Sequence, residues 1–134
     1  MVELHGWLCI RACAGDEDQL PAGEEAEAMQ RALALLQASP RKNDLHYQNG
    51  TPYLQTLLDA NHRGREADEI VQLYREIAAI ASGSYGMIYL HDDEDVKHFN
   101  SFVVYLFRRG HCGMHIDPYF TPCIPVIEDG EVLA

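Results

Sequence analysis

The dipeptide Asn49-Gly50, inside the segment 44–60, is the feature that most constrains the fold of this chain. Asn and Gly accept the positive φ angles of a two-residue turn, and together they are the strongest short-range signal for a β-hairpin. Pro52 has no backbone N–H to give to a strand ladder, so the second strand is expected to begin there or to lie at a sheet edge. The chain therefore contains at least one antiparallel strand pair.

Two other segments have the apolar spacing of amphipathic helices. Residues 66–82 place apolar side chains at the i, i+3, i+4, i+7 spacing, and Gly83 stands where a helix C-cap is expected. Residues 24–39 are rich in Ala and carry acids in the first turn, where they complement the helix dipole, and Pro40 ends the segment. The expected buried stripe of this first helix consists of Ala26, Met29, Leu33 and Leu36.

Three more segments, 4–13, 84–91 and 101–109, are predicted to be strands from their apolar pattern. Beyond Gly110 the chain is expected to be loop-like, because prolines interrupt it repeatedly. The element order is β-α-β-β-α-β-β. We therefore expect a single domain, residues 1–134, with an α+β fold in two layers: a mainly antiparallel sheet of about five strands with two helices on one face.

The charge balance limits the classes of partner. The chain has 21 Asp and Glu residues against 10 Lys and Arg, a net charge of −11. Nucleic acids and anionic membranes would repel such a protein, whereas a basic protein would be attracted. No stretch approaches the roughly 18 apolar residues of a membrane span, and the first residues do not have the pattern of a signal peptide. A cytoplasmic protein with reduced thiols is therefore expected.

Four consecutive acids, Asp92–Asp95, follow the strand expected at 84–91. They lack the spacing and the glycine of a calcium-binding EF-hand loop, and adjacent side chains in an extended chain point apart. A solvated connection between strands is the simpler interpretation, with no metal, cofactor or catalytic residue. The alternative is a small metal-dependent hydrolase that uses these acids together with His111 and His115.

Five motifs occur in order along the chain: LHGWLCI (4–10), NGTPYL leading to NHR (49–63), GSYGMIYLHDDED (83–95), FVVYLFRRG (102–110) and DPYFTPCIPVIED (117–129). In this order the sequence resembles immunity protein family 7 of bacterial polymorphic toxin systems. The resemblance implies an α+β domain that is not an enzyme. It also implies a partner: a cognate toxin, often a nuclease, which the immunity protein binds stoichiometrically to protect the cell that produces both.

The toxin-binding residues are expected from charge, because a nuclease presents a basic cleft that an acidic surface complements. One acidic area is the run at 92–95; the other is the segment 110–134, which contains no Lys or Arg. A third cluster, at 16–18, lies in the loop least like the family. A structural role for the acids at 92–95 stays open, as does the oligomeric state. The expected toxin-binding residues are Asp92, Asp93, Glu94, Asp95, Asp117, Glu128 and Asp129.

Overall fold

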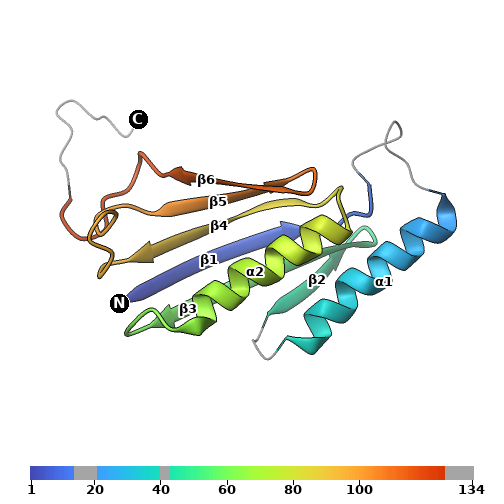
Figure 1. Cartoon of the computed structure of the whole chain (residues 1–134), viewed down its shortest axis with the longest axis horizontal. Helices are drawn as coiled ribbons and strands as arrows, with labels where there is room; N and C mark the ends of the chain where they lie inside the picture. Colours follow the sequence, from blue (N-terminus) through green and yellow to red (C-terminus); the bar gives the residue numbers. More distant parts are fainter. Residues whose placement is uncertain (14–20, 40–42, 126–134) are drawn as a thin grey trace.

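The computed structural model describes residues 1–13, 21–39 and 43–125 (Figure 1). Within these residues, six strands form one antiparallel sheet, and both helices cover the same face of it. The expected two-layer α+β architecture is therefore confirmed. The elements are β1 (Val2–Cys9), α1 (Ala22–Ala38), β2 (Asp44–Gln48), β3 (Thr51–Ala60), α2 (Arg65–Ile80), β4 (Tyr85–Asp92), β5 (Val103–Arg108) and β6 (His111–Ile116).

β1 lies in the middle of the sheet, between β3 and β4, in the strand order β2-β3-β1-β4-β5-β6. Leu4 is opposite Leu58 on one side and Leu90 on the other, so these residues share the face that the helices cover. The strand ends at Cys9 rather than at residue 13 as the sequence predicted, because the chain bends after Arg11 instead of continuing in the sheet.

The hairpin at Asn49-Gly50 is confirmed. Asn49 has a φ angle of 51° and Gly50 one of 78°, and Gln48 pairs directly with Thr51 across the two-residue turn. β3 begins one residue before Pro52 and lies inside the sheet, with β2 on one side and β1 on the other. The proline is tolerated there because it is near the strand end, beyond the last pair of β1 and β3, which is Cys9 with Tyr53. Its carbonyl oxygen accepts the N–H of Ile10, which follows β1.

A sixth strand, β6, stands where the sequence predicted a loop. The turn before it has positive φ angles at both residues, 49° at Arg109 and 78° at Gly110, as a two-residue hairpin requires. β6 then pairs with β5 along its whole length. The loop prediction was wrong because Arg-Gly is a weaker turn signal than Asn-Gly. The sequence of β6, HCGMHI, also contains few of the β-branched and aromatic residues typical of strands.

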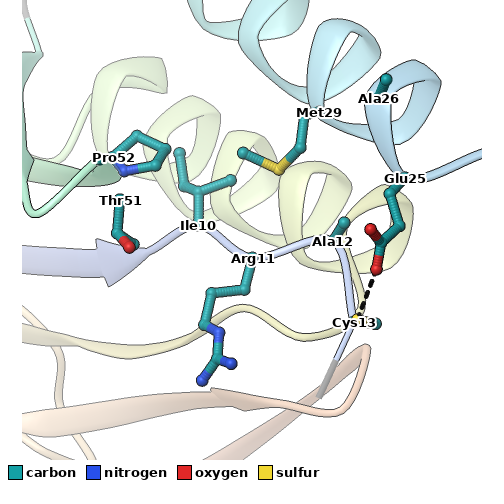
Figure 2. Close-up of a pocket in the computed structure, with 10 residues that line it drawn as sticks. Ile10, Arg11, Ala12, Cys13, Glu25, Ala26, Met29, Thr51 and Pro52 are labelled. Carbon is teal, nitrogen blue, oxygen red and sulfur yellow. Dashed lines mark hydrogen bonds between the residues drawn. The ribbon is translucent and has the colours of Figure 1, made fainter. Parts of the chain in front are cut away.

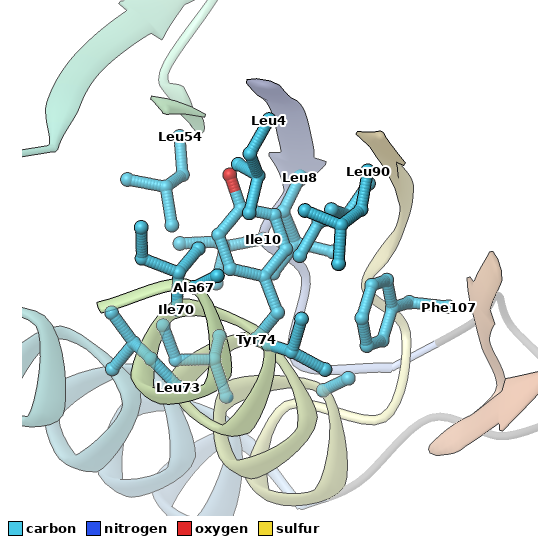
Figure 3. Packing of buried hydrophobic residues seen from close by; sticks show 14 of the residues in the cluster. Leu4, Leu8, Ile10, Leu54, Ala67, Ile70, Leu73, Tyr74, Leu90 and Phe107 are labelled. Carbon is cyan, nitrogen blue, oxygen red and sulfur yellow. The ribbon is translucent and has the colours of Figure 1, made fainter. Parts of the chain in front are cut away.

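Tyr74 of α2 is fully buried at the centre of the hydrophobic core. Its ring lies 5.6 Å from the ring of Phe107, between α2 and the sheet (Figure 3). Its hydroxyl lies 2.8 Å from the hydroxyl of Thr56, which donates to Asn43. Burial raises the pKa of Tyr74. Gly6 leaves the room for this hydroxyl, because a Cβ at position 6 would lie 2.8 Å from its oxygen.

Aliphatic side chains from the central strands and from α2 surround this tyrosine, and each contributes roughly 1.5–3 kcal/mol when fully buried. They are Val2, Leu4, Leu8, Leu54, Ile70, Ile77, Ile88 and Leu90.

α1 packs mainly against α2, on the same side of the sheet. The predicted stripe is therefore only partly correct: Met29, Leu33 and Leu36 pack against the core, but Ala26 is exposed. The buried positions of this helix include Ala28 and Ala32, whose small side chains permit close contact with α2. Periodicity indicated the helix, but not which neighbour its apolar face would meet.

Gly83 does not cap α2 as the sequence predicted. The C-cap is Ala81, and Gly83 does not have a positive φ angle. A Cβ on Gly83 would lie 2.0 Å from the carbonyl oxygen of Cys13, so this glycine permits a close backbone contact. The buried Ser84 follows, and its hydroxyl accepts a hydrogen bond from the backbone N–H of Arg11 at 3.1 Å. The GSYG segment thus fixes the chain that leaves β1.

Candidate functional site

Asp92–Asp95, which we call the acidic turn, consist of the last residue of β4 and the first three residues of the connection from β4 to β5. Oδ1 of Asp92 accepts the backbone N–H of Glu94 at 3.0 Å. Oδ1 of Asp95 accepts the backbone N–H groups of Lys97 and His98, at 3.0 and 3.3 Å. The hydrogen bond from Lys97 is the main cause that lowers the pKa of Asp95, and contacts with His98 add to it. Asp92 and Asp95 therefore shape the turn itself.

Asp93 and Glu94 connect the acidic turn to other parts of the chain. Oδ1 of Asp93 lies 2.6 Å from the amino group of Met1, and this hydrogen bond lowers the pKa of Asp93. Oε1 of Glu94 lies 2.5 Å from Nδ1 of His62, in the connection from β3 to α2. The side chains of Asp93 and Glu94 are still 36% and 55% exposed. Both carboxylates are therefore accessible to a partner.

Asp117 is placed inside the protein, with only 5% of the residue exposed. Its Oδ2 accepts the backbone N–H groups of Tyr119 and Phe120, at 3.2 and 2.9 Å. Its own N–H donates to the carbonyl oxygen of Phe102 at 2.9 Å. These contacts indicate a local role, which is to form the turn after β6 and to fix the position of Phe120.

The described part of the tail lies against the connection from β4 to β5. Oδ1 of Asn100 accepts the N–H groups of Cys123 and Ile124 at 3.0 and 2.7 Å, and its Nδ2 donates to the Ile124 carbonyl at 2.9 Å. These three hydrogen bonds hold the tail against the end of the connection that precedes β5. Two expected contact residues, Glu128 and Asp129, lie outside the described residues.

His111 and His115 both lie on β6, four residues apart, which is about 13 Å along a strand. His111 is opposite Arg108, which in turn is opposite Tyr85, so it lies at the end of the sheet away from the acidic turn. Among the described residues, no three His, Cys, Asp or Glu side chains gather into a group that would hold a metal ion. The hydrolase alternative therefore has no assembled site in this part of the chain.

A hollow of about 460 Å³ lies between the end of β1, the β2–β3 turn and α1 (Figure 2). The thiol of Cys13 donates to Oε1 of Glu25 at 3.1 Å. Reactive cysteines lie beside positive charges, and here the partner is a carboxylate. Residues 14–20, with the acidic cluster at 16–18, lie outside the described part of the chain. Among the described residues that line the hollow, none is in a setting that indicates catalysis.

The face of the sheet that the helices leave uncovered, which we call the open face, was missed by the sequence reasoning. Trp7, Tyr85 and Leu57 are 38%, 42% and 70% exposed there, and the Trp7 and Tyr85 rings meet edge to face at 6.1 Å. The signal was present in β4, where large apolar residues occupy both alternating sets of positions. Its apolar and aromatic strand residues include His5, Trp7, Leu57, Tyr85, Met87 and Tyr89.

Two adjoining hollows on the open face share His5 and Tyr89. The first, which we call the aromatic hollow, has a volume of about 320 Å³ and is lined by these two residues with Phe102 and Phe120. The ring centre of Phe102 lies 5.8 Å from Tyr89, 6.3 Å from Phe120 and 6.5 Å from His5. The second hollow, of about 470 Å³, extends over Trp7, Leu57 and Met87.

Comparison with known protein families matches residues 1–129 to immunity protein 7. No curated protein and no solved structure matches the chain. Neither α1 nor α2 is long and apolar enough, over the residues described, to cross a membrane. Because the family match covers nearly the whole chain, this protein belongs to the immunity protein 7 family.

Proposed function

We propose that this immunity protein binds a cognate toxin and neutralises it by stoichiometric association. The match of residues 1–129 to immunity protein 7 carries this proposal. The toxin is a nuclease with a basic substrate cleft, and the complex forms in the cytoplasm of the bacterial cell that makes both proteins. The immunity protein itself performs no catalysis and needs no metal.

The net charge of −11 supports a charge-assisted association. Opposite potentials on two proteins raise the rate of encounter by roughly ten- to a thousandfold. At 0.1 M salt, exposed charges more than about 10 Å apart are largely screened from one another. Association with a basic toxin is therefore expected to slow as the salt concentration rises, while dissociation changes less.

Within the acidic turn, Asp93 and Glu94 are the residues best placed to contact the toxin, because their carboxylates are exposed. Asp92 and Asp95 hold the turn in shape through backbone hydrogen bonds. Asp117 contributes to toxin binding indirectly, because it holds the backbone at Tyr119 and Phe120. Toxin contacts by Glu128 and Asp129 stay part of the proposal.

Co-expression with the toxin domain encoded beside this protein tests the proposal. We expect the cells to survive, and we expect the two proteins to purify as a one-to-one complex that forms more slowly in high salt. Cell death without a complex would refute the immunity role for that pair. Bound divalent metal, with a hydrolytic activity that chelation abolishes, would favour the hydrolase instead.

A pair of matched charge reversals locates the contact. The double variant Asp93→Lys and Glu94→Lys is expected to slow association by about tenfold or more at low salt. The control is the double variant Glu69→Lys and Glu76→Lys on α2, which changes the net charge equally on the helix side of the molecule. Equal slowing in both doubles would show that net charge acts as a whole and that the acidic turn has no special part.

A further inference from the structure

The aromatic hollow lies on a surface that no described segment of this chain covers. Phe120 at its margin is 62% exposed, although it is a large apolar side chain. Exposed apolar patches with polar borders commonly mark interaction sites in soluble proteins. The walls of the hollow come from four separate parts of the chain: β1, β4, the segment before β5 and the segment after β6.

The walls of the hollow are fixed in place. Phe102 has ring contacts with the other three side chains, and these restrain its position. Phe120 is held through its backbone N–H by the buried carboxylate of Asp117. The chain beyond Phe120 is anchored by Asn100. The hollow is thus formed before a partner arrives, which reduces the entropy lost on binding.

The margin of the hollow is acidic. Glu3 contacts Nε2 of His5, which lines the hollow, and Asp59 is directly opposite Glu3 in the sheet. Asp44 lines the adjoining second hollow. The alternation of side chains along each strand shows which described strand residues lie on the open face. Of these, Arg108 is the one Lys or Arg, and it lies opposite Tyr85 at the end of the sheet away from the acidic turn. A positively charged group would therefore be attracted to this end of the face.

We propose that the aromatic hollow receives an arginine side chain of the toxin, an inference that rests on the proposed function. The faces of aromatic rings attract cations within about 6 Å of the ring centre. The guanidinium of an arginine is planar, so it can stack on the ring of Phe102 or Phe120 while its N–H groups reach the carboxylate of Glu3. An apolar anchor would make no use of the acidic margin, and a lysine ammonium would not stack on the rings.

Under this proposal, the acidic turn and the aromatic hollow contribute to toxin binding in different ways. The acidic turn acts on the encounter, because exposed charges mainly change association rates. The aromatic hollow acts on the lifetime of the complex, because well-packed anchors mainly change dissociation rates. Variants of the two parts are therefore expected to differ in which rate constant they alter.

Phe120→Ala and Tyr119→Ala form a matched pair for the test. Both residues are exposed and adjacent, but only Phe120 lines the hollow. Binding to the purified, catalytically inactivated toxin domain is measured by surface plasmon resonance, after circular dichroism has shown that both variants are folded. Phe120→Ala is expected to dissociate about 10- to 30-fold faster, and Tyr119→Ala to stay within about twofold of the wild type.

The occupant is identified by double-mutant cycles between Phe120→Ala and each surface Arg→Ala variant of the toxin. Replacing one toxin arginine is expected to cause a loss of binding similar to that of Phe120→Ala. The loss for that pair of variants together is expected to be about as large as the larger of the two single losses. Equal binding by the Phe120→Ala and Tyr119→Ala proteins would refute the hollow as a contact. A loss that is additive with every toxin arginine would refute arginine as the occupant. A wild-type protein that neither binds nor protects would instead refute the proposed function, and this inference with it.

Discussion

Replacing Gly6 by Ala tests how closely the core is organised around Tyr74. A Cβ at position 6 would lie 2.8 Å from the Tyr74 hydroxyl oxygen and 3.2 Å from Cγ1 of Ile88. Thr56 holds that hydroxyl in a buried site, so it moves only at the expense of a hydrogen bond. Overpacking costs about 1–3 kcal/mol, and the smaller freedom of unfolded Ala offsets about 0.5–1 kcal/mol of this. We expect Gly6→Ala to lower the free energy of unfolding by about 0.5–2 kcal/mol.

A cycle with Tyr74→Phe separates the hydroxyl from the rest of the site. Tyr74→Phe alone is expected to cost about 0.5–1.5 kcal/mol for the lost hydrogen bond. Without the oxygen, the nearest atom to the new Cβ is Cζ at 3.1 Å, so Gly6→Ala costs less in this background. The double variant should therefore be more stable than the sum of the single effects predicts, by about 1 kcal/mol.

Urea unfolding, followed by the fluorescence of the single tryptophan, measures all four proteins of this cycle. Gly23→Ala is the control, because a Cβ there meets no atom within 4 Å. At this exposed helical position alanine is expected to stabilise the protein by up to about 1 kcal/mol. A Gly6→Ala protein as stable as the wild type, or additive effects in the cycle, would refute the reasoning.

Three other perturbations have expected outcomes. Ser84→Ala removes the acceptor of a backbone N–H in a buried site and should lower the free energy of unfolding by about 1–2 kcal/mol, whereas Ser82→Ala, at an exposed position, should be neutral in the same urea titration. The pKa of Asp95 is lowered from 3.8, so its charged form stabilises the fold above that value and the stabilisation is lost as the pH falls through the lowered pKa. The stability difference between the wild type and Asp95→Asn should accordingly stay constant from about pH 7 to about pH 5 and shrink as the pH falls further, and a difference that stays constant to about pH 3 would contradict this account. Asn100→Ala should speed hydrogen exchange at the amides of residues 123–124 by about tenfold or more, with no change in the amides of β1; unchanged exchange at 123–124 would show that other contacts hold the tail.

Local patterns predicted the hairpin at Asn49-Gly50 and both helices, because a positive φ angle or a helical spacing depends on a few neighbouring residues. β6 was not predictable in this way. Its residues have little strand preference of their own, and they form a strand because the turn at Arg109 and Gly110 brings them beside β5. The groups that approach Gly6 and Gly83 were not predictable for the same reason, since each belongs to a residue far away in the sequence.

The candidate site also combines features that the local sequence predicted with features that only the fold determines. The turn-like nature of Asp92–Asp95 was predictable from four adjacent acids after a strand. Their contact with His62 was not, because only the folded sheet brings the two connections together. The open face was also hidden. Both alternating sets of side chains in β4 are large and apolar, and only the position of the helices decides that Ile88 is covered while Tyr85 is exposed.

Because β1 lies in the middle of the sheet, a newly made chain can complete its sheet only after the later strands have been translated. Of the described strands, β1 leaves the ribosome first, but its neighbours are residues 51–60 and 85–92. The two halves of the sheet meet only through it, so a chain halted before β4 leaves half of the sheet unbuilt. At about 5–20 residues per second, several seconds of translation pass before all walls of the aromatic hollow exist. Under the proposed function, finished copies must therefore be present before the toxin enters, because a partial chain lacks half of the sheet and the walls of the hollow that β4 and the later segments supply.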